Sequence, residues 1–116
     1  MPIKSKIEPN SKVYFHTYKS VYLIDPEKII FCRKKDFGVD VCYLNNIIES
    51  VEVSFKDLEK KIPYLWKCHS DYLINLNYID KIIDINEDLI RMINGVCLPV
   101  SKDNKHLLIN EIQRYI

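Results

Sequence analysis

Short apolar stretches rich in Val, Ile, Tyr and Phe recur along the chain from Val13 onward, and polar residues separate them. Such stretches are typical of β-strands, because β-branched and aromatic side chains pack well on a pleated surface. The separators are residues that favour turns: Asp25-Pro26, Asp36-Phe37-Gly38, Asn45-Asn46, Asn86-Glu87-Asp88 and Asn94-Gly95. The pattern predicts an all-β fold of many short strands.

The clearest predicted hairpin joins the stretch from Leu89 to Ile93 to the stretch from Val96 to Val100 through Asn94-Gly95. Asn-Gly accepts the two positive φ angles of a type I′ turn, so the sequence predicts that turn here. Pro99 has no backbone N–H to donate, which predicts that its strand lies at a sheet edge or leaves the sheet there.

A second predicted hairpin pairs Ile29 to Arg33 with Val39 to Leu44 across the connection from Lys34 to Gly38. Side chains alternate between the two faces of a strand. The first, third and fifth residues of the second strand are therefore expected to face the core, and Asp40 is expected to face outward.

Two segments have helical rather than strand spacing. From Ser54 to Ile62 the apolar residues fall on one helical face, Ser54 is a suitable N-cap, and Pro63 ends the helix. A second helix is predicted after Ser101, its N-cap. Its apolar face is expected to contain Leu107 or Leu108, Ile112, and Tyr115 or Ile116.

The composition is that of one globular domain: 116 residues, 47% hydrophobic and 28% charged. We expect residues 1–12 to form a loose basic arm and residues 13–116 to form the domain. The net charge is only +1, so binding to nucleic acid would require a local cluster of cations. Glycine occurs only at Gly38 and Gly95, which excludes a P-loop and a dinucleotide-binding fingerprint.

No apolar run approaches the roughly 20 residues of a membrane-spanning helix, and the first residues lack the apolar region of a secretory signal. These features predict a cytoplasmic protein whose four cysteines are thiols. The cysteines and histidines have no metal-ligand spacing, so neither a metal nor a cofactor is predicted. Cys68 and His69 are adjacent, but they would point to opposite sides of a strand, which disfavours a thiol enzyme.

Polar residues at the ends of predicted elements form three groups that lie far apart in the sequence. They are Arg33-Lys34-Lys35, then Lys67 with His69-Ser70, then Lys102 with Asn104 and Lys105. If the fold brings the groups together, they make one basic ridge of the kind that binds phosphates and some bases. Taken singly, each has a simpler interpretation, such as a solvated loop for the first group and a hydrogen-bonding cap for His69.

The order of these features resembles a family, the LytTR-type DNA-binding domains. Leu65 to Ile79 is similar to its signature F-x-R-x-H-R-S-Y-x-V-N-x-x-x-I. Tyr22 to Phe31 resembles its opening strand, turn and strand, Ser54 to Ile62 its S-L-x-E-L-x-x-L helix, and Met92 to Lys102 its L-x-N-G-x-x-I-P-V-S-R hairpin. The resemblance covers about residues 13–116.

The resemblance implies about ten short strands in small antiparallel sheets, in an elongated domain with a short mid-chain helix and a C-terminal helix. It implies a sequence-selective regulator of transcription, not an enzyme, which inserts loops into the major grooves of promoter repeats as a homodimer. The implied DNA-facing residues are Lys34, Lys35, His69, Ser70 and Lys102. Lys67, Asn104 and Lys105 would be phosphate or support contacts, and Arg33 would lie near the ridge.

The chain departs from the family pattern at four positions. Lys67, Ser70 and Lys102 stand where arginine is usual, and Asp71 stands at a usual serine. Lysine cannot make the bidentate contact with guanine that arginine makes. The departures leave open an interaction module that no longer binds DNA. A second and less favoured alternative is a thiol enzyme that uses Cys68 and His69.

The family usually carries this domain behind a phosphorylated receiver, and these residues contain no receiver. We therefore expect control by expression, by dimerisation, or by a partner protein such as a receiver domain or a membrane-bound inhibitor. No insertion of the chain into a membrane is expected.

Overall fold

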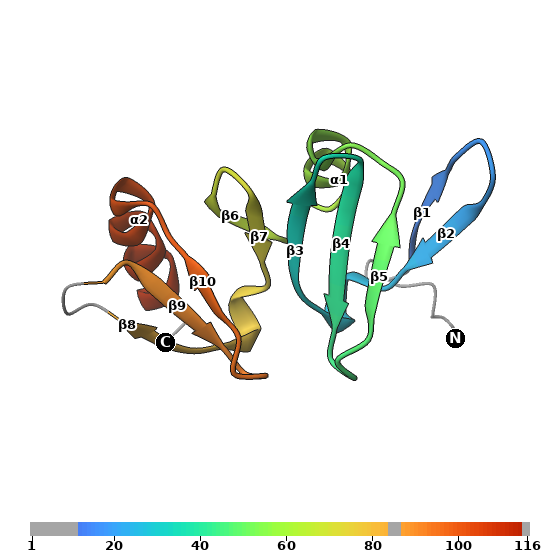
Figure 1. The fold of residues 1–116 in the computed structure, drawn as a ribbon. Helices are drawn as coiled ribbons and strands as arrows, with labels where there is room; N and C mark the ends of the chain where they lie inside the picture. The colour runs from blue at the N-terminus through green and yellow to red at the C-terminus, as the bar shows by residue number, and fades with distance from the viewer. Residues whose placement is uncertain (1–11, 84–86, 115–116) are drawn as a thin grey trace.

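The computed structural model describes residues 12–83 and 87–114. These residues form ten short strands and two α-helices, with 3₁₀ turns at Pro26–Lys28 (η1) and Leu76–Tyr78 (η2) (Figure 1). The helices are α1 (Phe55–Lys61) and α2 (Lys102–Gln113). The strands are β1 (Val13–His16), β2 (Val21–Ile24), β3 (Ile29–Lys35), β4 (Gly38–Tyr43), β5 (Ile48–Val51), β6 (Trp66–His69), β7 (Tyr72–Ile74), β8 (Ile79–Ile83), β9 (Leu89–Met92) and β10 (Cys97–Pro99).

The strands form three antiparallel sheets, which confirms the predicted fold class. β1 and β2 make a two-stranded sheet, β10-β9-β8 make a three-stranded sheet, and the largest sheet has the order β5-β4-β3-β7-β6. β10 is an edge strand, as Pro99 predicts. All of the predicted arm except Lys12 lies outside the described residues.

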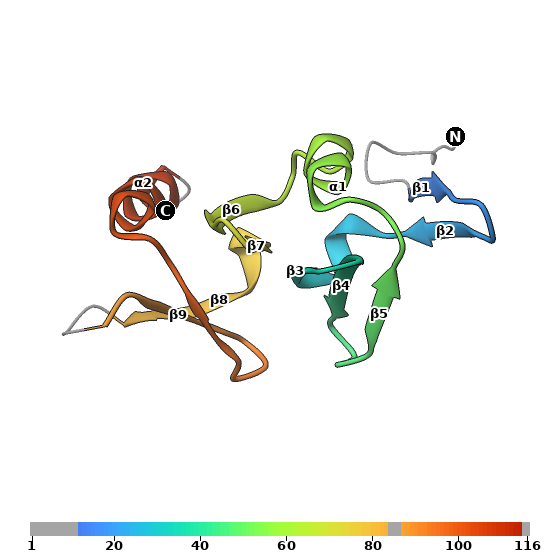
Figure 2. The same cartoon turned by 45° about the horizontal axis from the view of Figure 1, so that its top comes forward.

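The five-stranded sheet lies between two hydrophobic cores. One face packs against α1, where Leu58 joins Val39 and Val41 in the first cluster. Phe31 and Ile74 belong to the second cluster, together with residues of β9, β10 and α2. Figure 2 shows α1 on one side of the sheet and α2 beyond β6 and β7. The central sheet therefore connects the two halves of the molecule.

Both predicted helix caps are present. The Ser54 side chain accepts a hydrogen bond from the Asp57 N–H at 3.0 Å, and the Ser101 side chain accepts one from the Asn104 N–H at 3.2 Å. In α2 the buried apolar residue is Leu108, whereas Leu107 is 58% exposed. The last predicted apolar positions of this helix, Tyr115 and Ile116, lie outside the described residues.

The hairpin of β9 and β10 forms, but the predicted type I′ turn is wrong. Gly95 has a φ of +89°, and Asn94 is not among the described residues with a positive φ. The Gly95 N–H bonds the Met92 carbonyl and the Met92 N–H bonds the Val96 carbonyl, which leaves three residues in the loop. A type I turn followed by a positive-φ glycine has this form.

The hydrophobic pattern of the two strands explains the register. Leu98 pairs with Ile90 in the observed hairpin, and both are buried. A two-residue Asn94-Gly95 loop would shift the pairing by one position and place Leu98 opposite Arg91. A shift of one residue moves a side chain to the other face of the sheet, so core burial outweighs the local preference of Asn-Gly.

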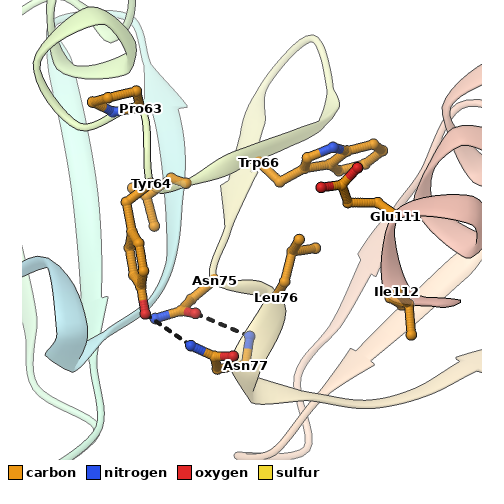
Figure 3. Close-up of a pocket in the computed structure, with 9 residues that line it drawn as sticks. Pro63, Tyr64, Trp66, Asn75, Leu76, Asn77, Glu111 and Ile112 are labelled. Carbon is orange, nitrogen blue, oxygen red and sulfur yellow. Dashed lines mark hydrogen bonds between the residues drawn. The ribbon is translucent and has the colours of Figure 1, made fainter. Parts of the chain in front are cut away.

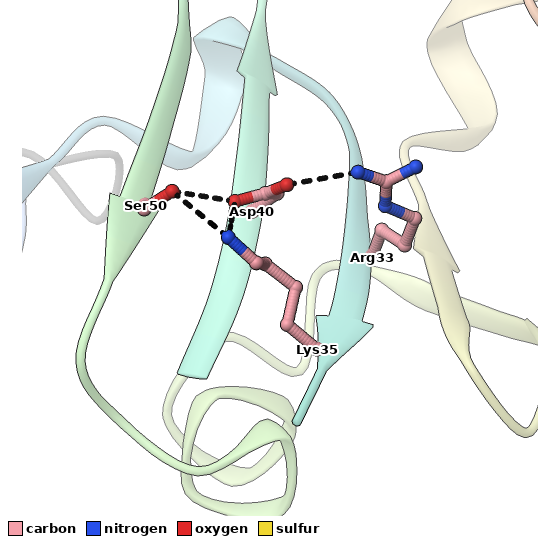
Figure 4. A network of polar contacts seen from close by, with 4 residues as sticks. All are labelled: Arg33, Lys35, Asp40 and Ser50. Atoms are coloured by element: carbon pink, nitrogen blue, oxygen red, sulfur yellow. Dashed lines mark hydrogen bonds and ion pairs between the residues drawn. The ribbon is translucent and has the colours of Figure 1, made fainter. Parts of the chain in front are cut away.

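Asp40 lies on the face of β4 opposite Val39 and Val41, as alternation predicts, but it is only 8% exposed and not open to solvent as expected. β4 has a neighbouring strand on each side, and Asp40 lies between Arg33 of β3 and Ser50 of β5. Arg33 Nη2 donates to Asp40 Oδ2 at 3.0 Å, and Ser50 Oγ donates to Asp40 Oδ1 at 2.6 Å (Figure 4). These partners make burial of the carboxylate possible.

Candidate nucleic-acid interface

The ends of three segments meet along one edge of the molecule. β3 pairs antiparallel with β7, so the end of β3 lies beside the turn between β6 and β7. The Lys34 N–H bonds the Asp71 carbonyl at 2.8 Å. The Ser101 N–H bonds the Cys68 carbonyl at 3.1 Å, which places the start of α2 beside the end of β6. In Figure 1 the three ends lie along the upper edge.

We name the exposed or half-exposed polar residues of this edge the basic edge, and define it as Lys34, His69, Ser70 and Lys102. Within residues 12–83 and 87–114, neither Lys34 nor Lys102 forms an ion pair. Lys102 is the first residue of α2, where a lysine opposes the helix dipole. Both ammonium groups are therefore available to an anion in solution.

His69 is held in one orientation by its own turn. Its Nδ1 accepts a hydrogen bond from the Asp71 N–H at 3.1 Å, and its ring packs edge-on against Tyr72 with the centroids 5.9 Å apart. An Nδ1 that accepts a hydrogen bond carries no proton, so the proton of the neutral ring lies on Nε2. Nε2 is thus the nitrogen of the neutral His69 ring that can donate a hydrogen bond.

The first predicted group does not act as one unit. β3 extends through Lys35, so alternation places Lys34 on one face and Arg33 with Lys35 on the other. Lys35 Nζ lies 3.3 Å from Asp40 Oδ1, beside the Arg33–Asp40 ion pair. One buried carboxylate therefore partly neutralises two of the three cations.

The remaining predicted residues have partners within the protein. Lys67 Nζ lies 3.8 Å from Glu59 Oε1, and its ammonium lies 5.9 Å from the Phe55 ring centroid. Asn104 Nδ2 donates to the Cys68 carbonyl at 3.4 Å, which ties α2 to β6. The Lys105 side chain is 12% exposed, and its Nζ lies 2.7 Å from Asp88 Oδ1. These three side chains are therefore engaged within the protein.

The thiol of Cys68 lacks the properties of a nucleophile. The residue is fully buried, and its Sγ lies 3.5 Å from the Pro99 carbonyl oxygen. Burial raises the pKa of Cys68 to about 12, so the thiol is protonated at neutral pH. His69, meanwhile, turns its Nδ1 to the backbone of Asp71. This geometry does not support the Cys68/His69 enzyme.

Among the described residues, no group of three or more His, Cys, Asp or Glu side chains is arranged to hold a metal ion. No helix formed by residues 12–83 and 87–114 has the length and apolar character needed to cross a bilayer.

The sequence did not indicate a pocket of about 380 Å³ between the start of β6, η2 and the end of α2 (Figure 3). Tyr64 and Trp66 line it, and the Tyr64 hydroxyl accepts a hydrogen bond from Asn77 Nδ2 at 2.8 Å. Glu111 lines it from α2, near the opposite end of the helix from Lys102. The pocket is therefore separate from the basic edge.

The sequence predicted the turn that contains Phe37, but it did not indicate that this turn lies next to the basic edge. Phe37 is 94% exposed and lies in the turn that joins β3 to β4. An aromatic residue between Asp36 and Gly38, in a turn rather than a strand, was the available signal.

Comparison with known proteins gives one family. Residues 19–113 match the family model of the LytTr DNA-binding domain. Four solved chains match the structure, among them one described as the LytTr DNA-binding domain of a methyl-accepting/DNA response regulator from Bacillus cereus. It is 23% identical, with a TM-score of 0.68 over 86% of this chain and 94% of that chain. At this identity the likeness shows the fold. A search of curated proteins found no match.

Proposed function

The chain belongs to the family of LytTr DNA-binding domains, and from this premise we propose that it is a sequence-selective regulator of transcription. It binds double-stranded DNA through the basic edge, whose turns enter the major grooves at promoter repeats. Lys34 and Lys102 bind phosphates or bases, and His69 and Ser70 donate to base edges or phosphates.

The observation that carries this proposal is the convergence of three separate segments. Backbone hydrogen bonds join Lys34 to Asp71 and Ser101 to Cys68, so the basic edge is built on strand ends rather than on long loops. A rigid edge of this kind loses little conformational entropy when it binds. Lys67, Asn104 and Lys105 support it through their contacts with Glu59, Cys68 and Asp88.

Arg33 and Lys35 have a secondary role in the proposal. Asp40 holds both side chains on the face of the sheet away from Lys34, where they add positive potential near the DNA. Two copies bind as a homodimer on paired repeats, and a regulatory protein, such as a receiver domain or a membrane-bound inhibitor, controls the chain.

A protein interaction module on the same fold is the second candidate. It is favoured by the net charge of +1 and by the neutralisation of Arg33 and Lys35 by Asp40. Asp71, exposed in the β6–β7 turn, adds a negative charge beside the basic edge. In this case the edge would bind a protein surface and not the phosphates of a duplex.

A binding selection from random duplexes at two salt concentrations separates the two functions. About five phosphate contacts predict a slope of about −4 to −5 for log K against log salt. Lys34→Ala and Lys102→Ala should each weaken binding and, for a phosphate contact, reduce the magnitude of the slope by about one. A selection that enriches no sequence, with a flat salt response, would favour the interaction module.

The matched control is Lys28→Ala. Lys28 is an exposed lysine immediately before β3, at the opposite end of that strand from Lys34. Its removal changes the net charge by the same amount, so it should leave the slope almost unchanged. Equal effects of Lys28→Ala and Lys34→Ala would show that only the overall charge matters and that the basic edge is not the binding surface.

A further inference from the structure

Phe37 differs from the other phenylalanines of this chain. Three of the four are buried, with Phe15 at 5%, Phe31 at 8% and Phe55 at 8% exposed, whereas Phe37 is 94% exposed. A single exposed apolar residue is common on protein surfaces. Its significance here depends on where the side chain lies.

Phe37 lies beyond the end of β3, next to the basic edge. The last pair of the hairpin is Lys35 with Gly38, so only Asp36 and Phe37 form the turn. Lys34 precedes the turn by two residues and contacts the β6–β7 turn through its backbone. The turn that carries Phe37 therefore lies at the same edge as Lys34 and His69.

The turn is fixed against its neighbouring strand. Gly38 has a φ of +106°, and a Cβ at this position would overlap the Val51 carbonyl oxygen of β5. Such close packing of backbones fixes the backbone of the turn that carries Phe37. A turn that is already ordered loses little conformational entropy when it binds.

The chemistry of the tip favours base edges over phosphates. Asp36 shares the turn with Phe37, and the nearby Lys35 ammonium is held by Asp40. An anion and a phenyl ring are poor ligands for phosphate. In the major groove, the apolar group that a base presents is the C5-methyl of thymine, and phenylalanine is one of the residues that contacts it.

We propose that Phe37 contacts a thymine methyl group in the major groove and selects a T·A pair in the target site. This inference rests on the proposed DNA-binding function. It assigns base selection to an apolar side chain, in a chain whose basic edge carries lysine where the family usually has arginine.

The test uses the full chain and a duplex taken from the random selection, with each thymine replaced in turn by deoxyuridine, which lacks only the methyl group. One replacement should weaken binding by the wild-type chain about three- to fourfold, the value of one buried methyl group. Phe37→Ala should weaken binding about tenfold, and it should bind the thymine and deoxyuridine duplexes equally. Phe37→Leu should keep part of the difference.

Ile48→Ala is the control, because Ile48 is 59% exposed on β5 and pairs with Cys42, at the end of β4 far from Gly38. It should keep the wild-type response to deoxyuridine. The inference is overturned if no deoxyuridine duplex binds more weakly, or if Phe37→Ala keeps the wild-type difference. Either outcome would be measured on a duplex that the wild-type chain binds with a steep dependence of log K on log salt. Failure of this inference is therefore distinguishable from failure of the proposed DNA binding.

Discussion

Arg33 Nη2 donates to Asp40 Oδ2 at 3.0 Å between two directly paired positions of β3 and β4. The Arg33 side chain remains 52% exposed, whereas that of Asp40 is 12% exposed. The arginine is thus held at the surface by a carboxylate that is largely removed from water. Lys35 and Ser50 complete the contacts of the same carboxylate. The contacts of Asp40 thus stabilise the sheet and also partly neutralise the positive charge of Arg33 and Lys35.

Asp40 should make the stability of the protein depend on pH in the acid range. Burial raises its pKa, but hydrogen bonds from Ser50, Arg33 and Lys35 outweigh burial and hold the pKa below its usual value of 3.8. Because the unfolded chain binds this proton more readily, the stabilisation is complete above about pH 4 and is lost as the pH falls through the folded-state value.

This prediction is tested by comparing the stability of the Asp40→Asn variant with that of the wild type. At neutral pH we expect the variant to be about 1–2 kcal/mol less stable than the wild type, because hydrogen bonds to a charged acceptor become neutral ones. Urea unfolding from about pH 7 to about pH 2 should show this difference shrinking toward acid. A difference that stays constant with pH would mean that the Asp40 charge does not contribute.

Cys68 and Cys97 should differ strongly in reactivity. Cys68 is buried with its pKa raised to about 12, and Cys97 is exposed on β10. The thiolate is the reactive form, so at neutral pH alkylation should modify Cys97 within minutes and Cys68 only after unfolding. Peptide mapping by mass spectrometry after brief treatment with iodoacetamide measures both. Rapid modification of Cys68 in the folded chain would revive the thiol-enzyme alternative.

The local elements could be predicted from the sequence because their signals are local. Ser54 and Ser101 cap their helices as predicted, and apolar alternation gives the paired strands. The positions of the three polar groups at element ends also follow from the chain. Their convergence does not, because it depends on β7 inserting beside β3, a pairing that periodicity does not encode.

The errors share one cause, which is that tertiary neighbours decide between local options. Asn94-Gly95 favours a type I′ turn, but the burial of Leu98 beside Ile90 selects another register. Asp40 lies on the predicted face of β4, but Arg33 and Ser50 of the neighbouring strands contact its carboxylate and reduce its exposure. Similarly, the prediction placed Arg33, Lys34 and Lys35 in one group as if they formed a loop. β3 extends through Lys35, so these side chains alternate between the two faces of the strand.

The two glycines should differ in how much an alanine costs. Both have positive φ, +106° at Gly38 and +89° at Gly95, so either alanine incurs about 1–2 kcal/mol of backbone strain. A Cβ at Gly95 meets no atom within 4 Å, but one at Gly38 overlaps the Val51 carbonyl. We therefore expect Gly38→Ala to lower the unfolding free energy by at least about 1 kcal/mol more than Gly95→Ala. Equal losses in urea unfolding would argue against close packing of the β3–β4 turn on β5.

The role of His69 can be divided between its two ring nitrogens. Nδ1 holds the turn through the Asp71 N–H, and Nε2 is the nitrogen left to donate to DNA. His69→Ala removes both functions. His69→Asn keeps the first, because an asparagine oxygen readily accepts from the backbone N–H two residues later. It does not extend as far as Nε2.

We therefore expect both variants to lose about 1–3 kcal/mol of discrimination between the selected duplex and a random one. The melting temperature should stay close to that of the wild type in His69→Asn and fall slightly in His69→Ala, because the lost hydrogen bond is exposed. Titrations with the two duplexes and thermal melts give both quantities. If His69→Asn instead binds the selected duplex as the wild type does, the imidazole serves only to fix the β6–β7 turn, and recognition at this turn must come from Ser70 or the backbone.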